Sequence, residues 1–166
     1  KLATDLIDNF KNVYEDKWLN MMRGKLGLIG EHKNDKKLAT DLLNWMEKNK
    51  ADYTNTFCHL MNIDTKDNIY KKKDFLIWTK EWEKRSELNN SNKEKKIKLM
   101  KKNNPLIIPR NHIVEEALAK AENGDLDKIK DLLKVLKDPL NDQTKITKYQ
   151  MPAPISNEKY QTYCGT

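Results

Sequence analysis

Apolar residues recur at a spacing of three to four along nearly the whole chain, and this periodicity constrains the fold most. On a helix such residues line one face, whereas a half-buried strand alternates polar and apolar residues. The spacing predicts seven helices, at about 3–22, 35–49, 53–61, 73–89, 91–102, 113–123 and 126–136. We therefore expect an all-α protein, an irregular bundle of about six or seven helices with an extended C-terminal tail.

Glycines and capping residues mark the ends of the first helices. Gly24, Gly27 and Gly30 are expected to end the long first helix, because glycine adopts the left-handed conformation of helix ends at little cost. Asp52 or Thr54 can cap the third helix, since a short polar side chain there accepts a hydrogen bond from a free backbone N–H.

Similar signals bound the later helices. Ser91 and Glu94 fit a capping box at the start of the fifth helix. Gly124 can end the sixth helix in the left-handed conformation, and Asp125 can cap the next one. These positions predict where each helix begins and ends.

The length of 166 residues suits a single core. We expect one helical domain over residues 1–166, with a first helical group at 1–61, a second at 74–136 and an irregular tail at 137–166. The tail contains three prolines, which interrupt regular structure.

The net charge of +7 is carried almost entirely by lysine, with 29 Lys and three Arg against 25 acidic residues. Arginine is the residue favoured for bidentate phosphate and guanine contacts, so the excess favours a solvated lysine face over a nucleic-acid groove. The alternative is a basic interaction or nucleic-acid-binding module that uses residues 66–102.

No segment is long and apolar enough to suggest a membrane span. The longest apolar run is residues 106–108, whereas a span needs about 18 residues. No charged-then-apolar leader opens the chain. We therefore expect a soluble, cytoplasmic protein with neither a membrane nor a nucleic acid as partner.

The sequence contains neither a glycine-rich phosphate loop nor a recognisable metal-ligand spacing. His32, His59 and His112 stand in different segments, and we expect no metal or cofactor site formed by this chain alone. Cys58 is expected to be a buried thiol beside a histidine. Cys164, close to the C-terminus, is the redox candidate, with a small apolar tail residue as the alternative.

Residues 104–118 contain a further candidate functional motif. Pro109 is expected to fix the entry to a helix, Asn111 to cap it and Arg110 to reach a carboxylate or carbonyl, with His112 following. Each of these is a structural role, so we interpret the segment as a packed loop entering a helix rather than a ligand site.

Several motifs occurring in order resemble one known family. They are Asn-Pro-x-x-Ile-Pro-Arg-Asn-His-x-Val-Glu-x-Ala-Leu from residue 104, Leu-Leu-x-Val-Leu-x-x-Pro at 132–139, the ending Tyr-Cys-Gly-Thr, and Met-Arg-Gly-Lys-Leu-Gly-Leu at 22–28. Together they resemble the C-terminal region of the selenoprotein O family, also called YdiU or UPF0061.

The resemblance implies a longer enzyme with a kinase-like fold that transfers AMP from ATP, or UMP from UTP, to Ser, Thr or Tyr hydroxyls with Mg²⁺ or Mn²⁺. The family's nucleotide-binding and metal-binding residues lie in its N-terminal kinase-like part, so no catalytic residue is carried over to this chain. The resemblance implies a C-terminal fragment that acts as a scaffold, with the kinase-like part and protein substrates as partners. It also implies a redox role for Cys164, which stands where eukaryotic relatives have selenocysteine.

Overall fold

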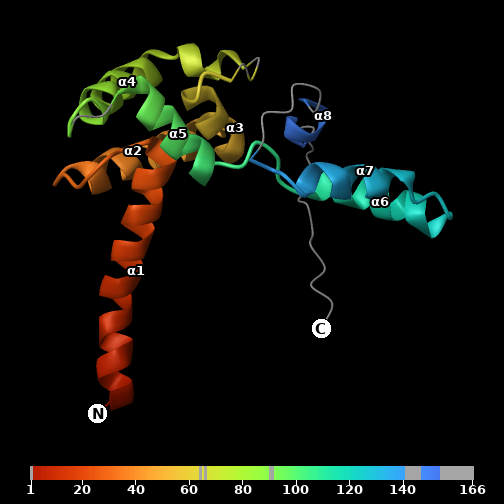
Figure 1. Ribbon diagram of the computed structural model, residues 1–166, viewed down its shortest axis with the longest axis horizontal. Coiled ribbons are helices and arrows are strands. Elements are labelled where there is room, and N and C mark those ends of the chain that lie inside the picture. Colours follow the sequence, from red (N-terminus) through yellow and green to blue (C-terminus); the bar gives the residue numbers. More distant parts are fainter. Residues whose placement is uncertain (1, 64, 66, 90–91, 141–146, 154–166) are drawn as a thin grey trace. The chain divides into compact units, whose positions relative to one another are not determined.

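A computed structural model describes residues 2–63, 65, 67–89, 92–140 and 147–153, and every regular element in them is helical. The elements are α1 (Leu2–Leu26), α2 (Asp35–Asn49), α3 (Tyr53–Leu60), the 3-10 helix η1 (Asn68–Lys71), α4 (Lys73–Ser86), α5 (Lys93–Asn103), α6 (Asn111–Glu122), α7 (Asp127–Leu136) and α8 (Thr147–Gln150) (Figure 1). The all-α prediction is confirmed. The sequence did not predict η1, or α8 within the tail expected to be irregular.

The chain divides into two compact units. Unit 1 is Lys1–Ile107 with Pro139–Asp142, and unit 2 is Ile108–Asp138 with Gln143–Thr166. The boundary falls inside the apolar segment 103–109, not in the polar stretch 62–73 that separates the two predicted groups. The polar stretch belongs to unit 1 because η1 contacts α4 and buries Tyr70.

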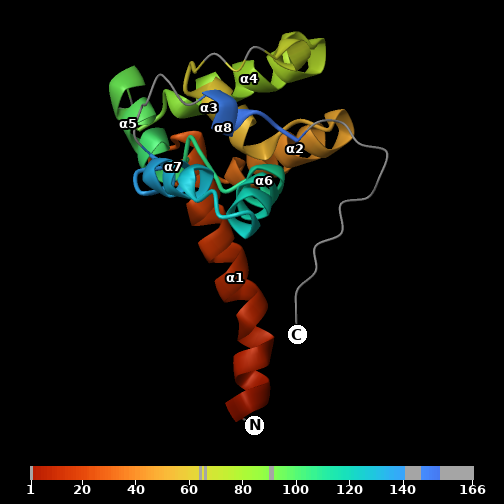
Figure 2. The ribbon, with the colours of Figure 1, turned by 90° about the vertical axis from the view of Figure 1, so that its right-hand side faces the viewer.

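Unit 1 is built around the C-terminal half of α1. This helix contacts α2, α3 and α5, and α2 in turn contacts α4. Figures 1 and 2 both show these helices gathered at the C-terminal end of α1. The core is rich in aromatic rings, with 4.5 Å between the ring centroids of Trp45 and Phe75 and 6.0 Å between those of Trp78 and Trp82. The apolar stripes predicted for α2 and α4 are therefore buried against each other.

The long first helix ends later than predicted. Gly24 lies inside α1, and the helix continues to Leu26 before Gly27 takes a left-handed φ of +67°. The prediction that Gly24 ends the helix is wrong, because this glycine makes room for α5: a Cβ there would lie 2.9 Å from the Asn103 side chain. Neither α1 nor any other helix in the described part of the chain has the length and apolarity needed to cross a membrane.

The other boundary predictions have mixed outcomes. Asp52 caps α3 by accepting a hydrogen bond from the backbone N–H of Asn55 at 2.8 Å, as predicted. The capping box at Ser91 is wrong, since Asn92 is the N-cap of α5 and accepts from the backbone N–H of Lys95 at 2.8 Å. Ser91 itself lies outside the described residues.

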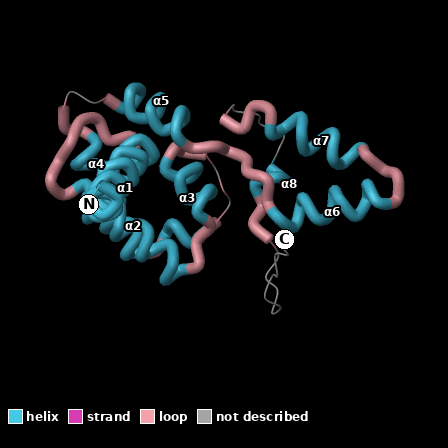
Figure 3. The backbone as a smooth tube through the Cα atoms, turned by 90° about the horizontal axis from the view of Figure 1, so that it is seen from below, coloured by secondary structure: helices cyan, strands magenta, loops and turns pink. Residues whose placement is uncertain are grey.

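Unit 2 contains the helices α6, α7 and α8. Figure 3 shows α6 and α7 as neighbouring helices joined by a short loop, and the two are in contact. Gly124 follows α6 with a φ of +83°, as predicted for a left-handed helix end. Leu126 is the N-cap of α7, yet the Asp125 carboxylate still accepts a hydrogen bond from the backbone N–H of Asp127 at 3.0 Å.

Candidate functional site

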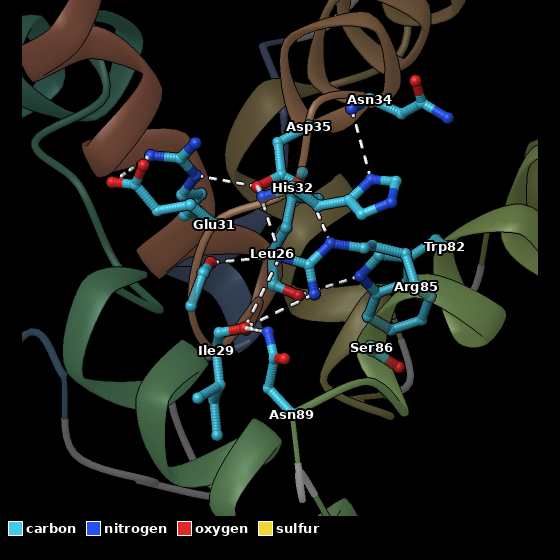
Figure 4. A network of polar contacts seen from close by, with 12 residues as sticks. Leu26, Ile29, Glu31, His32, Asn34, Asp35, Trp82, Arg85, Ser86 and Asn89 are labelled. Atoms are coloured by element: carbon cyan, nitrogen blue, oxygen red, sulfur yellow. Dashed lines mark hydrogen bonds and ion pairs between the residues drawn. The ribbon is translucent and has the colours of Figure 1, made fainter.

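The carboxylate of Asp35 is completely buried between two arginines in unit 1 (Figure 4). Arg23 of α1 donates from Nε to Oδ2 at 2.8 Å, and Arg85 of α4 donates from Nε to Oδ1 at 2.7 Å. The backbone N–H of His32 donates to Oδ2 at 2.9 Å. Because Asp35 opens α2, this one carboxylate joins three helices.

Arg85 extends the cluster to the loop between α1 and α2. Its Nη2 donates to the carbonyl oxygen of Gly30 at 3.0 Å, and the side chain of Asn89 donates to the carbonyl of Ile29 at 2.9 Å. Nearby, the indole N–H of Trp82 donates to the carbonyl of Leu26, at the end of α1, at 2.8 Å. These bonds satisfy backbone carbonyls that would otherwise be left without partners at a helix end and in a turn.

The electrostatics of Asp35 favour a permanent carboxylate. Burial raises its pKa, but the hydrogen bonds from Arg85, Arg23 and the His32 backbone outweigh burial, and the net effect holds the pKa of Asp35 below its ordinary value of 3.8. Both oxygens of this carboxylate accept hydrogen bonds from protein donors. The arrangement therefore suits a structural ion pair that holds helices together better than a group that accepts and releases protons.

A pocket of about 550 Å³ lies beside Arg85, between α2 and α4. Its lining mixes charges of both signs: His32, Asn34, Lys37, Leu38, Asp41, Glu81, Lys84, Arg85 and Leu88. Lys37 and Asp41 form an ion pair across one turn of α2, with 2.5 Å between Nζ and Oδ2. Three basic and two acidic side chains therefore line this pocket.

Asn104 forms a second buried polar junction, at the start of the predicted motif. Its amide donates to the carbonyl of Lys25 at 2.8 Å and to the carbonyl of Met100 at 2.9 Å, so it joins the C-terminal ends of α1 and α5. The ammonium of Lys25 donates to the carbonyl of Asn103 at 3.2 Å and lies over the ring of Phe57. Burial lowers the pKa of Lys25.

The structure places the rest of the predicted motif at the start of α6. Arg110 is the N-cap, its side chain makes no capping hydrogen bond, and Asn111 is the first helical residue. The prediction that Asn111 caps α6 is therefore wrong by one position, and Pro109 lies in the loop before the cap. The expected reach of Arg110 to a carboxylate or carbonyl stays a prediction.

His112 lines a pocket of about 280 Å³ within unit 2. Its neighbours there include Glu116 of the same helix, Lys128 and Asp131 of α7, and Tyr149 of α8. Lys128 pairs with Glu116 across the two helices. In the described residues, no three side chains of His, Cys, Asp or Glu are grouped so that they could hold a metal ion.

Comparison with known proteins identifies the family. Residues 1–137 match the family described as "Protein adenylyltransferase SelO". The chain belongs to this family. A protein of Pelagibacter ubique named "Protein nucleotidyltransferase YdiU" is 51% identical over all of this chain.

Two more relatives with the same name also match almost the whole chain. They come from Nitrosococcus oceani, 41% identical over 99% of this chain, and Bacillus cereus, 43% identical over all of it. The chain spans about a third of the length of these relatives, 35% of the Pelagibacter protein and 34% of the other two.

The predictions for the two cysteines have different outcomes. Cys58 is completely buried in α3, as predicted for a structural thiol. The ring of its neighbour His59 stacks on Tyr70, with 4.1 Å between centroids. Cys164 lies outside the described residues, so its redox role stays a prediction.

Among the described lysines of residues 66–102, Lys96 is half-buried and the others are exposed. The Lys96 ammonium lies 4.3 Å from the centroid of the Trp82 ring, and Lys72 donates to the side chain of Asn49 at 2.7 Å. Lys93, Lys98 and other lysines of α5 are exposed. An exposed helix with lysines on several sides is typical of a solvated face as well as of a basic binding surface.

Sequence reasoning missed Asp35 and Arg85 as partners. Asp35 is preceded by a turn and opens a helix, which fits an ordinary N-terminal acid. The available signal was Arg85, a rare arginine in a lysine-rich chain, next to buried tryptophans. A buried carboxylate needs such a partner, but the separation of 50 residues hides the pair.

Proposed function

We propose that the chain is the helical part of a protein nucleotidyltransferase that transfers AMP or UMP, from ATP or UTP, to Ser, Thr or Tyr hydroxyls of proteins. The observation that carries this proposal is the 51% identity, over the whole chain, to a relative named protein nucleotidyltransferase. Family membership over residues 1–137 supports it.

In the proposed reaction a protein hydroxyl attacks the α-phosphate of the nucleotide, and pyrophosphate leaves. Bound Mg²⁺ or Mn²⁺ would neutralise charge on the phosphates. The described residues do not fit such a metal, because no three His, Cys, Asp or Glu side chains among them are grouped as ligands, and the buried carboxylate of Asp35 is bonded to arginines. We therefore assign nucleotide and metal binding to the kinase-like remainder of the protein.

The role of this chain in the proposal is to support that remainder. Its buried polar groups already serve packing, as Asp35 does between three helices and Asn104 does between two. The partners in the proposal are the kinase-like part and the protein substrates, in the cytoplasm. Cys164 would add a redox-sensitive position near the C-terminus.

The test uses the full-length protein with a mixture of extract proteins, Mg²⁺ or Mn²⁺, and radiolabelled ATP or UTP. We expect label from the α-phosphate to become bound to protein, while label on the γ-phosphate leaves with pyrophosphate. Protein labelled only from the γ-phosphate would indicate a kinase and overturn the proposal. An absence of labelling from either nucleotide would also contradict it.

The basic-module alternative is tested on the same protein by titrating nucleic acid at several salt concentrations. Binding through lysines should weaken steeply with salt, because each phosphate contact releases counterions. We expect no saturable binding at physiological salt, since the charge excess is carried by lysine rather than arginine and two of these lysines, Lys72 and Lys96, contact other side chains within the fold.

A further inference from the structure

Helix α1 exposes a row of large apolar side chains, here called the α1 stripe: Ile7, Phe10, Val13 and Tyr14. Ile7 is 73% exposed, Phe10 68% and Tyr14 59%. The rings of Phe10 and Tyr14 lie against each other, with 6.2 Å between centroids. Figures 1 and 2 both show the N-terminal half of α1 extending away from the other helices of unit 1.

The α1 stripe lies on a different face from the one that unit 1 buries. At about 100° per residue, Met21 returns to within about 20° of Phe10, whereas Met22 points about 100° further round. Met21 is exposed, and Met22 is completely buried with Leu26. The exposed face therefore continues onto the packed half of α1, where unit 1 covers only the other face.

An uncovered stripe of this kind needs a partner. Most of the stability of a helix in a protein comes from packing of its apolar face, and a contiguous apolar patch on the surface marks an interaction site. Near the middle of α1, the surface ion pair of Glu15 with Lys36 joins this helix to α2. Packing on the stripe is the missing source of stability.

The rest of the full-length polypeptide is the partner best suited to cover the α1 stripe. The relatives are about three times as long as this chain, so most of the polypeptide lies outside it. A segment tethered in the same chain acts at an effective concentration in the millimolar range, which favours it over a second copy.

The charges of α1 argue against a membrane surface. Between residues 5 and 17 the helix carries four acidic and two basic residues. A helix that lies on a membrane is usually rich in lysine and arginine on its polar face. Lys17 stands in line with the stripe, between Tyr14 and Met21, so the covering surface must leave it in solvent or offer it an acidic side chain.

We propose that the α1 stripe is an intramolecular docking face, covered in the full-length protein by an apolar surface of the chain outside these 166 residues. This inference rests on the proposed function in one respect, that the chain works as part of a longer nucleotidyltransferase. The occupant is thus the kinase-like remainder of the same polypeptide.

A photo-crosslinking amino acid placed at Phe10 in the full-length protein tests the docking face directly. We expect a cross-link within one polypeptide, to residues outside the 166, identified by mass spectrometry of the peptides. Asn12 is the matched control, because it is exposed and lies two residues on, nearly on the opposite side of the same helix from Phe10. A cross-link to a second copy or to lipid, or none above the Asn12 control, would overturn the proposal.

Hydrogen exchange in the full-length protein gives a second measurement. We expect the backbone amides of residues 7–17 to be protected, and Phe10→Glu to speed their exchange at least tenfold, whereas Asn12→Glu should change it less than twofold. Equal exchange in both variants would contradict docking. Protection without nucleotidyl transfer would leave docking standing and reject the proposed function, and transfer with unprotected amides would do the reverse.

Discussion

Asp35 shows how a single side chain can fix the arrangement of several helices. Its carboxylate is fully desolvated, which is costly, and two guanidinium groups and a backbone N–H compensate that cost. The geometry requires α1, α2 and α4 to meet at one point. Removing the carboxylate would leave the buried Arg85 and the half-buried Arg23 without their shared partner.

We therefore expect Asp35→Asn to lower the free energy of unfolding by about 3–5 kcal/mol, the usual cost of breaking a buried ion pair. Denaturant unfolding followed by tryptophan fluorescence measures the change. Asp41→Asn is the control, because its pair with Lys37 lies at the surface and its loss should matter little. Equal losses of unfolding free energy in the two variants would show that Asp35 does not stabilise the packing of the three helices.

The same carboxylate predicts how stability depends on pH. The pKa of Asp35 is lower in the folded protein than its ordinary value of 3.8, so its contribution is complete above about pH 3.8 and is lost as the pH falls through the lower folded value. We expect the stability of the parent protein to fall more steeply below pH 3.8 than that of Asp35→Asn. Parallel curves from unfolding at several acid pH values would refute this.

Gly27 combines two constraints at one residue. Its φ is +67°, and a Cβ would lie 2.7 Å from Cγ of Lys96 and 2.8 Å from Cγ of Met100. We expect Gly27→Ala to destabilise the protein by about 2–4 kcal/mol, from left-handed strain together with overpacking.

Gly124→Ala separates these two effects, because Gly124 has a φ of +83° with no atom within 4 Å of the added Cβ. We expect it to cost only the backbone strain, about 1–2 kcal/mol. Denaturant unfolding of both variants compares them. A cost at Gly124 as large as at Gly27 would mean that the close approach of α5 contributes nothing.

At the scale of elements, Asn104 explains why α1 and α5 end side by side. The last carbonyls of a helix have no partner within it, and this one amide satisfies a carbonyl from each helix. The following Pro105 favours an extended conformation at Asn104, which ends α5 there.

We expect Asn104→Ala to lower stability by about 1–3 kcal/mol, since it removes the side-chain donor from the part-buried carbonyl of Lys25 and the buried carbonyl of Met100. Asn123→Ala is the control, because Asn123 also donates to a carbonyl one turn back, that of Ala119, but is exposed to water. Thermal unfolding of both variants gives the comparison. If Asn123→Ala lowered stability as much as Asn104→Ala, the two hydrogen bonds of Asn104 would have no special role in joining α1 and α5.

At the scale of the whole molecule, unit 2 interrupts unit 1 in the sequence. The backbone N–H of Leu106 donates to the carbonyl of Pro139 at 2.7 Å, so the two ends of the interruption meet within unit 1. A segment inserted between two adjacent positions lowers the stability of the surrounding unit by little more than the entropy of closing a loop.

A chain of residues 1–107 joined by a short Gly/Ser linker to 139–142 should therefore keep the cooperative unfolding of unit 1. All four tryptophans, Trp18, Trp45, Trp78 and Trp82, lie in unit 1, so their fluorescence reports on it. We expect one transition near the midpoint of the parent protein. Loss of a cooperative transition would show that unit 1 depends on unit 2.

The sequence by itself predicted the seven helices α1–α7 and the inward faces of α2 and α4. Spacing placed the apolar residues of α2 and α4, and Asp52 and Gly124 marked boundaries through local backbone chemistry that needs only near neighbours. Family membership was also readable from the motifs, and residues 1–137 confirm it. Such properties depend on residues a few positions apart.

Only the tertiary structure decided which residues meet across the chain. Local pattern gave Gly24 as a helix end, but the approach of α5 made it a contact point inside α1. The pairing of Asp35 with Arg85, and the exposure of the α1 stripe beside the buried Met22, depend on how whole helices cross. Periodicity shows that a face is apolar, whereas only packing decides what covers it.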